Sequence, residues 1–306
     1  NHEAAASHDV TVQVTDVAGA TYDETFTIAV GDVNEGPVAV DDTATTSENA
    51  AIKLDVLAND SDPDDGNRLS LDAAKVTEGG GVVSVDDGVL TYDPGSAYDH
   101  LAVGESAEVT VAYQISDEKG LTDQAEVTFK VTGSNDGPVV AAPLADQAST
   151  EDAAFSFQVP AGSFADLDTS DTLSYSATLS DGSALPAWLS FDASTQTFSG
   201  TPENDDVGAV NITVTATDPH GATAADTFEI TTANTNDTPD DLTLDNASVD
   251  ENASDGTVVG TAAGSDVDVG DVLSYSLTDD AGGRFAIDAD TGEITVADSS
   301  ALNHEA

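Results

Sequence analysis

The sequence predicts an all-β chain in which β-sandwich domains follow one another in a linear rod. Three observations predict it. Short runs of alternating apolar and polar residues, rich in valine, isoleucine, threonine and phenylalanine, recur along the chain. No stretch keeps a helical period over three turns. An acidic, turn-prone joint ends on a proline at three places that are 101 residues apart (Pro37, Pro138 and Pro239).

Each block ends in two alternating runs that predict a β-hairpin. The first run closes on an aspartate, and these aspartates are again 101 residues apart (Asp16, Asp117 and Asp218). A turn containing glycine follows, and then comes a second run (24–30, 125–131 and 226–232). Several short strands per block, with turn signals every ~8–12 residues, predict an immunoglobulin-like sandwich in particular.

The joints divide the chain into two whole domains, 37–137 and 138–238, and two partial ones. Residues 239–306 form the front half of a domain, and residues 1–36 form the back half. The tetrapeptide NHEA occurs twice, at an offset of 302 residues, which is close to three blocks. The front half lacks the final hairpin, and open sheet edges seek a partner strand. We therefore expect further copies of the repeat to join end to end, in a covalent array or as a head-to-tail polymer, with the covalent array favoured.

Charge and composition restrict the partners. The chain has 59 acidic and 6 basic side chains and a formal net charge of −53, which excludes a nucleic acid or an anionic membrane as its natural partner. There is no cysteine, so cores and metal must hold the domains in place of disulfides. No apolar run reaches ~18 residues, so membrane insertion is not expected. The opening residues do not resemble a signal peptide, and we expect an interior piece of a longer protein.

Acidic residues recur in register around the joints. A glutamate follows each joint (Glu48, Glu151 and Glu251), and an Asp-x-Asp cluster follows the glutamate (62–64, 166–168 and 266–268). Calcium binds about six to eight oxygens from carboxylates, amides and carbonyls, and the joints offer those groups without thiols or grouped histidines. Two carboxylates ~5 Å apart repel by ~3 kcal/mol at an effective dielectric of 20. The sequence therefore predicts Ca²⁺ as the cofactor that stiffens each joint.

Residues 238–306 followed by 1–36 resemble a cadherin repeat. They carry the motifs DEN, SDVD, FAIDADTGEI, LNHEA, VTDVAG and DVNEGP. In cadherins the ions lie between consecutive domains, so the resemblance implies ligands on both sides of each joint. For the joint at 32–36 the implied ligands are Glu251, Glu305, Asp32 and Asn34, with Asp62, Asp64 and Asp117 from the next domain. Asp16 holds the position of Asp117 in the partial domain.

The two whole domains resemble other cadherin-like families. Residues 38–136 resemble the bacterial VCBS repeat through VLANDSDPDDG and YQISDEKG, and residues 139–237 resemble the dystroglycan-type cadherin-like domain through LPAWLSFDASTQTFSGTPENDDVG. Neither has an LNHE turn. The mixture resembles the extender region of giant bacterial adhesins secreted by a type I (RTX-like) system, which implies an extracellular or surface-attached segment. The implied ligands of the two later joints are Glu48, Asn135, Asp136, Asp166, Asp168 and Asp218, then Glu151, Asn236, Asp237, Asp266 and Asp268.

Other interpretations of the acidic clusters are weaker. The DSDPDDG stretch has the first spacings of an EF-hand, but Asp65 stands where the glycine belongs and Leu71 where the last glutamate belongs. Acidic residues that only solvate surface loops would not explain why the clusters recur at the same position in three blocks. No pair of carboxylates is singled out for a glycosidase, Trp188 lies in an apolar stretch typical of a core, and the histidines have no ligand or triad spacing. We therefore expect no enzyme.

The alternative function is a glycan- or protein-recognition module of an adhesin or of a polysaccharide-degrading enzyme. Loops at the domain tips would carry such recognition. In the favoured interpretation, a surface glycan or protein is bound outside this segment.

Overall fold

The computed structural model describes residues 4–64 and 66–302. Within this part of the chain the regular elements are β-strands and short 3-10 helices, with no α-helix, which confirms the predicted all-β class. The chain divides into two compact units. The first holds the residues up to Ala141 together with Phe164–Ser174 and Ala216–Ala224, and the second holds the rest.

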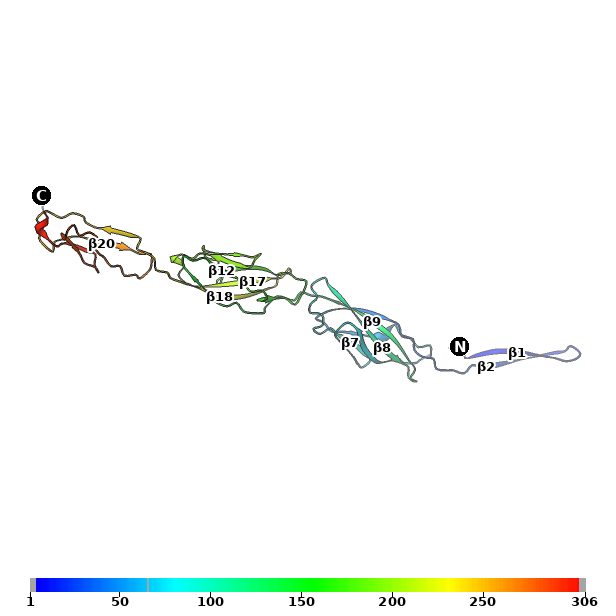
Figure 1. Cartoon of the computed structure of the whole chain (residues 1–306). Coiled ribbons are helices and arrows are strands. Elements are labelled where there is room, and N and C mark those ends of the chain that lie inside the picture. Colours follow the sequence, from blue (N-terminus) through cyan, green and yellow to red (C-terminus); the bar gives the residue numbers. More distant parts are fainter. Residues whose placement is uncertain (1–3, 65, 303–306) are drawn as a thin grey trace. The chain divides into compact units, whose positions relative to one another are not determined.

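The described chain begins with a two-stranded hairpin, β1 (Ser7–Thr15) and β2 (Thr21–Ala29), labelled in Figure 1. The strands pair in antiparallel register over nine residue pairs. Every residue of both strands is exposed, so neither face of this ribbon packs on another element of the described chain. An isolated hairpin of this kind is marginally stable in water.

Residues 38–132 form a sandwich of a four-stranded sheet, in the order β3-β9-β8-β5, and a three-stranded sheet, in the order β4-β7-β6. The first strand of the sandwich runs parallel to its last strand over six residue pairs, so the chain enters at one end and leaves at the other. The elements are β3 (Asp42–Ser47), β4 (Ile52–Leu54), η1 (Val56–Ala58), β5 (Ser70–Glu78), β6 (Val82–Asp86), β7 (Val89–Asp93), β8 (Ser106–Ser116) and β9 (Thr122–Thr132).

The core of this sandwich follows from the alternation along β8 and β9. Alternate residues of both strands are buried, and the residues between them are half-buried or exposed. Among the buried rings, Tyr92 stacks on Phe129 with centroids 4.7 Å apart. Tyr113 is 2% exposed, and its hydroxyl donates to the Val40 carbonyl at 2.9 Å. The polar end of this buried ring is therefore satisfied.

Residues 139–233 repeat the plan, with sheets in the orders β11-β18-β17-β14 and β12-β16-β15 and a short β10-β13 pair. Here β11 runs parallel to β18. The elements are β10 (Val139–Val140), β11 (Gln147–Thr150), β12 (Phe155–Gln158), β13 (Phe164–Ala165), β14 (Ser174–Leu179), β15 (Leu189–Asp192), β16 (Thr197–Gly200), η2 (Asn204–Asp206), β17 (Gly208–Thr217) and β18 (Thr223–Ala233).

Aromatic rings fill the core of the second sandwich. Phe198 is fully buried, with Phe191 and Phe228 at centroid distances of 4.6 and 5.7 Å. Trp188 is half-buried and packs edge-on against Phe155 at 6.0 Å. The tryptophan therefore has a packing role, as its apolar neighbours in the sequence suggested.

Residues 241–302 form one four-stranded sheet, in the order β19-β20-β22-β21. Its elements are β19 (Asp241–Leu244), β20 (Val258–Ser265), β21 (Phe285–Ile287), β22 (Glu293–Val296) and η3 (Ser299–Ala301). The intervening residues 245–257 and 266–284 contribute no strand. This segment therefore has a single sheet, whereas a sandwich requires two.

Candidate metal centres at the domain junctions

An aspartate closes the turn between the last two strands of the first sandwich. Asp117 Oδ1 accepts hydrogen bonds from the backbone N–H groups of Lys119 and Leu121 at 2.9 and 2.8 Å. Gly120, at φ +90°, supplies the left-handed conformation that this tight turn needs. The other oxygen, Asp117 Oδ2, accepts from Asn34 Nδ2 of the preceding linker at 2.6 Å. One buried carboxylate thus joins the turn to the linker.

The second sandwich repeats this arrangement. Asp218 Oδ1 accepts from the N–H groups of His220 and Ala222 at 2.8 and 2.9 Å, and Asp218 Oδ2 accepts from Asn135 Nδ2 at 2.8 Å. The asparagine hydrogen bond, helped by the turn N–H groups, favours the charged carboxylate and lowers the pKa of Asp218. The equivalent bond from the linker lowers the pKa of Asp117. Both groups are prepared to remain anions.

Each Asp-x-Asp cluster forms the same tight loop. The N–H of the second aspartate donates to Oδ1 of the first at 2.8, 3.1 and 3.0 Å (Asp62 and Asp64, Asp166 and Asp168, Asp266 and Asp268). The second aspartate is buried in all three loops. A linker N–H donates to its Oδ2 at 2.9, 2.9 and 2.6 Å (Glu35 to Asp64, Asp136 to Asp168, Asp237 to Asp268). The three Asp-x-Asp clusters, which recur at regular spacing in the sequence, therefore share one hydrogen-bond geometry.

The glutamate at the end of the first strand reaches the linker that leaves the sandwich. Glu48 Oε1 accepts from the N–H and the hydroxyl of Ser134 at 2.8 and 2.9 Å. Glu151 Oε1 accepts from the N–H of Thr235. Each glutamate is only 1% exposed. Burial of a carboxylate costs free energy unless both of its oxygens have a partner. The surroundings of the second oxygen of each glutamate therefore decide whether these residues can be metal ligands.

The buried oxygens without a hydrogen-bond partner gather at the junctions. Ten buried side-chain polar atoms of the described residues have no such partner, and all ten are carboxylate or amide oxygens. They are Asn34 Oδ1, Glu48 Oε2, Asp62 Oδ2, Asp64 Oδ1, Asn135 Oδ1, Glu151 Oε2, Asp166 Oδ2, Asp168 Oδ1, Asp171 Oδ2 and Asn204 Oδ1. Native structures rarely leave buried polar atoms unpaired. An oxygen-only set of this kind fits a calcium ion.

Among the described residues, three sets of three carboxylates have oxygens that lie within 4.8 Å of one another. They are Asp166, Asp171 and Asp218; Glu151, Asp237 and Asp268; and Asp266, Asp268 and Asp271. Burial, followed by the charges of Asp168 and Glu48, raises the pKa of Asp136. Burial also raises the pKa of Asp166. The charged forms of Asp136 and Asp166 are therefore disfavoured at this junction.

Several predicted ligands are exposed or lie outside the described residues. Asp32, Glu251 and Asp16 are exposed, and Asp16 accepts from the N–H groups of Ala18 and Ala20 in its own turn. Glu305 lies outside the described residues. Asn236 is exposed, and its amide donates to the Asp237 carbonyl at 2.6 Å.

In the third linker a different asparagine reaches the Asp-x-Asp loop. Asn234 Nδ2 donates to Asp268 Oδ1 at 3.0 Å. Asp171 and Asp271 were also not predicted from the sequence, although each is a third aspartate just after an Asp-x-Asp pair. Nor was Asn204, whose amide donates to Asp237 Oδ2 at 3.0 Å. No periodic signal marked Asn204, because η2 brings it to the linker only in the folded domain.

In calcium-free solution, we expect the unfolding temperature to rise as the pH falls from 7 towards the unfolded pKa of ~3.9. The raised pKa values of Asp136 and Asp166 give stability that is complete below the unfolded pKa of ~3.9 and is lost as the pH rises through the folded values. Asp117 and Asp218, with lowered pKa values, contribute above ~3.9 and lose that contribution as the pH falls further.

The gain in unfolding temperature should therefore reverse below about pH 4. Thermal melts between pH 7 and 3 check this course. The same series in millimolar calcium is the control, because an ion that binds the charged carboxylates removes the gain in unfolding temperature on acidification. A melting temperature that falls steadily from pH 7 in calcium-free buffer would contradict the assignment.

Comparisons with known proteins place both whole sandwiches among immunoglobulin-like domains. Residues 34–130 match a family model described as a bacterial Ig domain, and residues 137–233 match one described as a putative Ig domain. Among solved structures, protocadherin gamma B7 extracellular cadherin domains 1–4 are similar with a TM-score of 0.59 and 16% identity, covering 97% of this chain and 76% of theirs. Human CDH23 EC21-23 is similar with a TM-score of 0.55 and 21% identity, covering 87% and 90%. These likenesses show a fold of tandem cadherin-like sandwiches.

A curated relative is the calcium-binding lectin RapA2 of Rhizobium johnstonii. It is 32% identical over 140 residues, which cover 41% of this chain and 59% of the relative. The chain thus spans less than two thirds of that protein. In the described part of the chain, no helix has the length and apolar character needed to cross a bilayer.

Proposed function

We propose that the chain is a non-catalytic segment of tandem β-sandwiches that calcium stiffens at the junctions, within an extracellular bacterial adhesin or surface fibre. One observation carries the proposal. All ten buried polar atoms that lack a hydrogen-bond partner in the described residues are oxygens, and each belongs to a linker or to a residue close to one. A solvated acidic surface would leave such oxygens in water.

The junction around 135 illustrates how an ion would be held. Glu48 comes from the sandwich before the linker, Asn135 and Asp136 from the linker, and Asp166, Asp168 and Asp218 from the tip of the next sandwich. A bound calcium ion would supply positive charge to oxygens that otherwise repel one another. The chain's own contribution is positional, since the turn and linker N–H groups already direct these carboxylates.

The same assignment extends to the other junctions. The linker at 32–36 would use Asn34 with Asp62, Asp64 and Asp117, and the linker at 234–237 would use Glu151, Asp237, Asp266 and Asp268. The proposed domains are 37–137 and 138–238, flanked by the partial domains 1–36 and 239–306. Asp32, Glu251 and Glu305 remain proposed ligands of the joint that another copy would complete.

The relative supports the extracellular context. Its name describes a calcium-binding lectin, and the acidic composition of this chain suits a medium that holds calcium at millimolar levels. An adhesin segment needs to present a binding domain at a distance, and stiff junctions serve that purpose. The proposed adhesin is secreted by a type I, RTX-like system.

Small-angle scattering tests the stiffening. We expect calcium to lengthen the particle, because neutralised junctions stop splaying, and removal of calcium to give a shorter average dimension and a more flexible profile. Magnesium at equal concentration is the matched control, since it dehydrates reluctantly and demands octahedral geometry. Identical profiles with and without calcium would refute the stiffening.

The name of the relative favours recognition of a glycan as a second candidate. In that case a tip loop would bind sugar through calcium. Binding of this chain to an immobilised glycan array, abolished by chelation and restored by calcium, would support the second candidate over a purely mechanical segment.

A further inference from the structure

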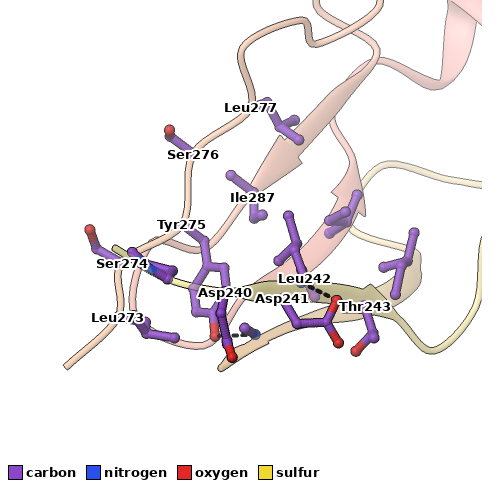
Figure 2. A pocket seen from close by; sticks show the side chains of 15 residues that line it. Asp240, Asp241, Leu242, Thr243, Leu273, Ser274, Tyr275, Ser276, Leu277 and Ile287 are labelled. Carbon is purple, nitrogen blue, oxygen red and sulfur yellow. Dashed lines mark hydrogen bonds between the residues drawn. The ribbon is translucent and has the colours of Figure 1, made fainter. Parts of the chain in front are cut away.

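The single sheet of residues 241–302 carries an open apolar hollow. The hollow has a volume of about 750 Å³ and is lined by Leu242 and Leu244 of β19, by Ile287 and Ile294, and by the stretch 273–277. Figure 2 shows that stretch along one side of the hollow, with Leu242 and Ile287 facing the space. Leu242 is 68% exposed. A sandwich core without its second sheet would have this appearance.

The chain itself shows which elements the hollow lacks. The tetrapeptide LSYS occurs at 173–176 and at 273–276. In the second sandwich it begins β14, which pairs with β17, but 273–276 forms no strand. Similarly, β11 at Gln147–Thr150 pairs with β18, whereas 247–250, which also precedes the repeated glutamate, forms no strand. The missing element is the hairpin that would lie between these two stretches.

The β1–β2 hairpin has the complementary face. Val10, Val12, Val14, Phe26 and Ile28 are between 43 and 61% exposed. The residues 101 positions later, Val111, Tyr113, Ile115, Val127 and Phe129, are at most 2% exposed. The residues 202 positions later, Ile212, Val214, Ala216, Phe228 and Ile230, are equally buried. The same five positions are core in both whole sandwiches and exposed in the hairpin.

The hydrogen bond between a linker asparagine and the hairpin-turn aspartate shows the same difference between the whole sandwiches and the partial one. Asn34 and Asn135 each donate to the aspartate that closes the hairpin turn of the following sandwich. Asn236 has the same place in the third linker and donates to the Asp237 carbonyl instead. Asp16 closes the β1–β2 turn with the same two backbone hydrogen bonds as Asp117 and Asp218.

We propose that the β1–β2 hairpin of a second copy of this sequence inserts between 247–250 and 273–278 and covers the hollow. The five apolar side chains then enter a core, and Asp16 of that copy meets Asn236. The completed sandwich rests on backbone pairing and apolar contact, so it goes beyond the calcium proposal and does not depend on it. The copy can be linked covalently or be a separate chain, and separate chains allow the test.

A disulfide pair tests the register, because the chain has no cysteine of its own. Ser70 lies directly opposite Ser116 in the first sandwich, and the Ser174 hydroxyl donates to the Thr217 carbonyl in the second. The equivalent pair is Ser274 and Thr15. The full chain carrying Thr15→Cys and Ser274→Cys should give a ladder of disulfide-linked multimers on oxidation, because opposed strand residues meet disulfide geometry.

The matched control pairs Ser274→Cys with Thr25→Cys, which lies on β2, the strand of the hairpin that does not adjoin 273–278, and should give no ladder. A fast-migrating linked monomer would show that the hollow takes the hairpin of its own chain, which overturns the second copy. Absence of any linkage in the Thr15 pair would overturn docking altogether.

Sedimentation tests the apolar face without cysteines. Experiments are run at about 0.5 M salt, where screening reduces repulsion between the acidic chains. The average mass of the unmodified chain should rise with concentration, and Phe26→Asp should weaken this association by ~100-fold or more. Thr25→Asp is the control and should associate normally. Phe26 is already 52% exposed, so the whole sandwiches should keep their melting temperature. Equal association of the two variants would overturn the proposal.

Discussion

Addition of 10 mM calcium should raise the unfolding temperature of this chain by roughly 5–20 °C. An ion that binds the folded junction and not the unfolded chain stabilises by RT ln(1 + [Ca²⁺]/Kd). With affinities in the extracellular range of about 10⁻⁴–10⁻³ M, this amounts to ~1.4–2.7 kcal/mol per ion. A sandwich of this size gains about 4–8 °C for each kcal/mol. Calorimetry or circular dichroism measures the shift.

Two controls separate binding from screening. Sodium chloride at equal ionic strength reduces repulsion among all 59 acidic side chains but supplies no ligand-specific energy. Magnesium supplies the same charge with a poorer fit. A shift of the same size in all three salts would mean that general screening, and not binding at the junctions, stabilises the fold.

The effect of the substitution Asp168→Asn on the melting temperature should change sign when calcium is added. Asp168 is 1% exposed, accepts from the Asp136 N–H through Oδ2, and leaves Oδ1 without a hydrogen-bond partner. Without metal, an amide keeps the shape, removes one charge from a repelling group and adds a donor for a neighbouring carboxylate. We expect the melting temperature to rise by a few degrees, about 1 kcal/mol, because only part of the ~3 kcal/mol repulsion is relieved.

With calcium, the same variant should lose most of the stabilisation that the ion gives to the junction around 135. The variant would then melt below the unmodified chain, although it melted above it in calcium-free buffer. Glu126→Gln is the matched control, since Glu126 is exposed on β9 and its substitution removes the same charge away from the linkers. If Asp168→Asn destabilises the chain equally in both buffers, Asp168 serves the fold alone and binds no ion.

The strands and the repeat could be predicted from the sequence better than the details of each site. Alternation along 109–117 and 125–131 placed the hairpin of the first sandwich, because every second side chain enters the core. The recurrence of Asp62, Asp166 and Asp266, each two residues before a second aspartate, predicted loops of one geometry. Each prediction rested on local spacing, which a chain shows directly.

The missed contacts depend on folding over longer distances. Asn204 meets Asp237 because η2 and the linker lie at the same end of the sandwich, and no spacing announces that. In the third joint the described part of the following segment has no equivalent of the Asp117 and Asp218 turns for Asn236 to reach, and Asn234 donates to Asp268 of the Asp-x-Asp loop. The stretch 273–277 resembles β14 in sequence, yet it forms no strand without a neighbour to pair with.

The parallel pairing of the first and last strands gives each whole sandwich a mechanical property. Tension along the chain would pull β3 and β9 in opposite directions along their shared axis. Their backbone hydrogen bonds would then be loaded in shear and would have to break together, in contrast to a hairpin pulled from its open end, which unzips one bond at a time. A surface fibre exposed to flowing liquid benefits from that geometry. A hairpin docked from another copy would be held in the same shear arrangement, with its resistance set by the length of the pairing.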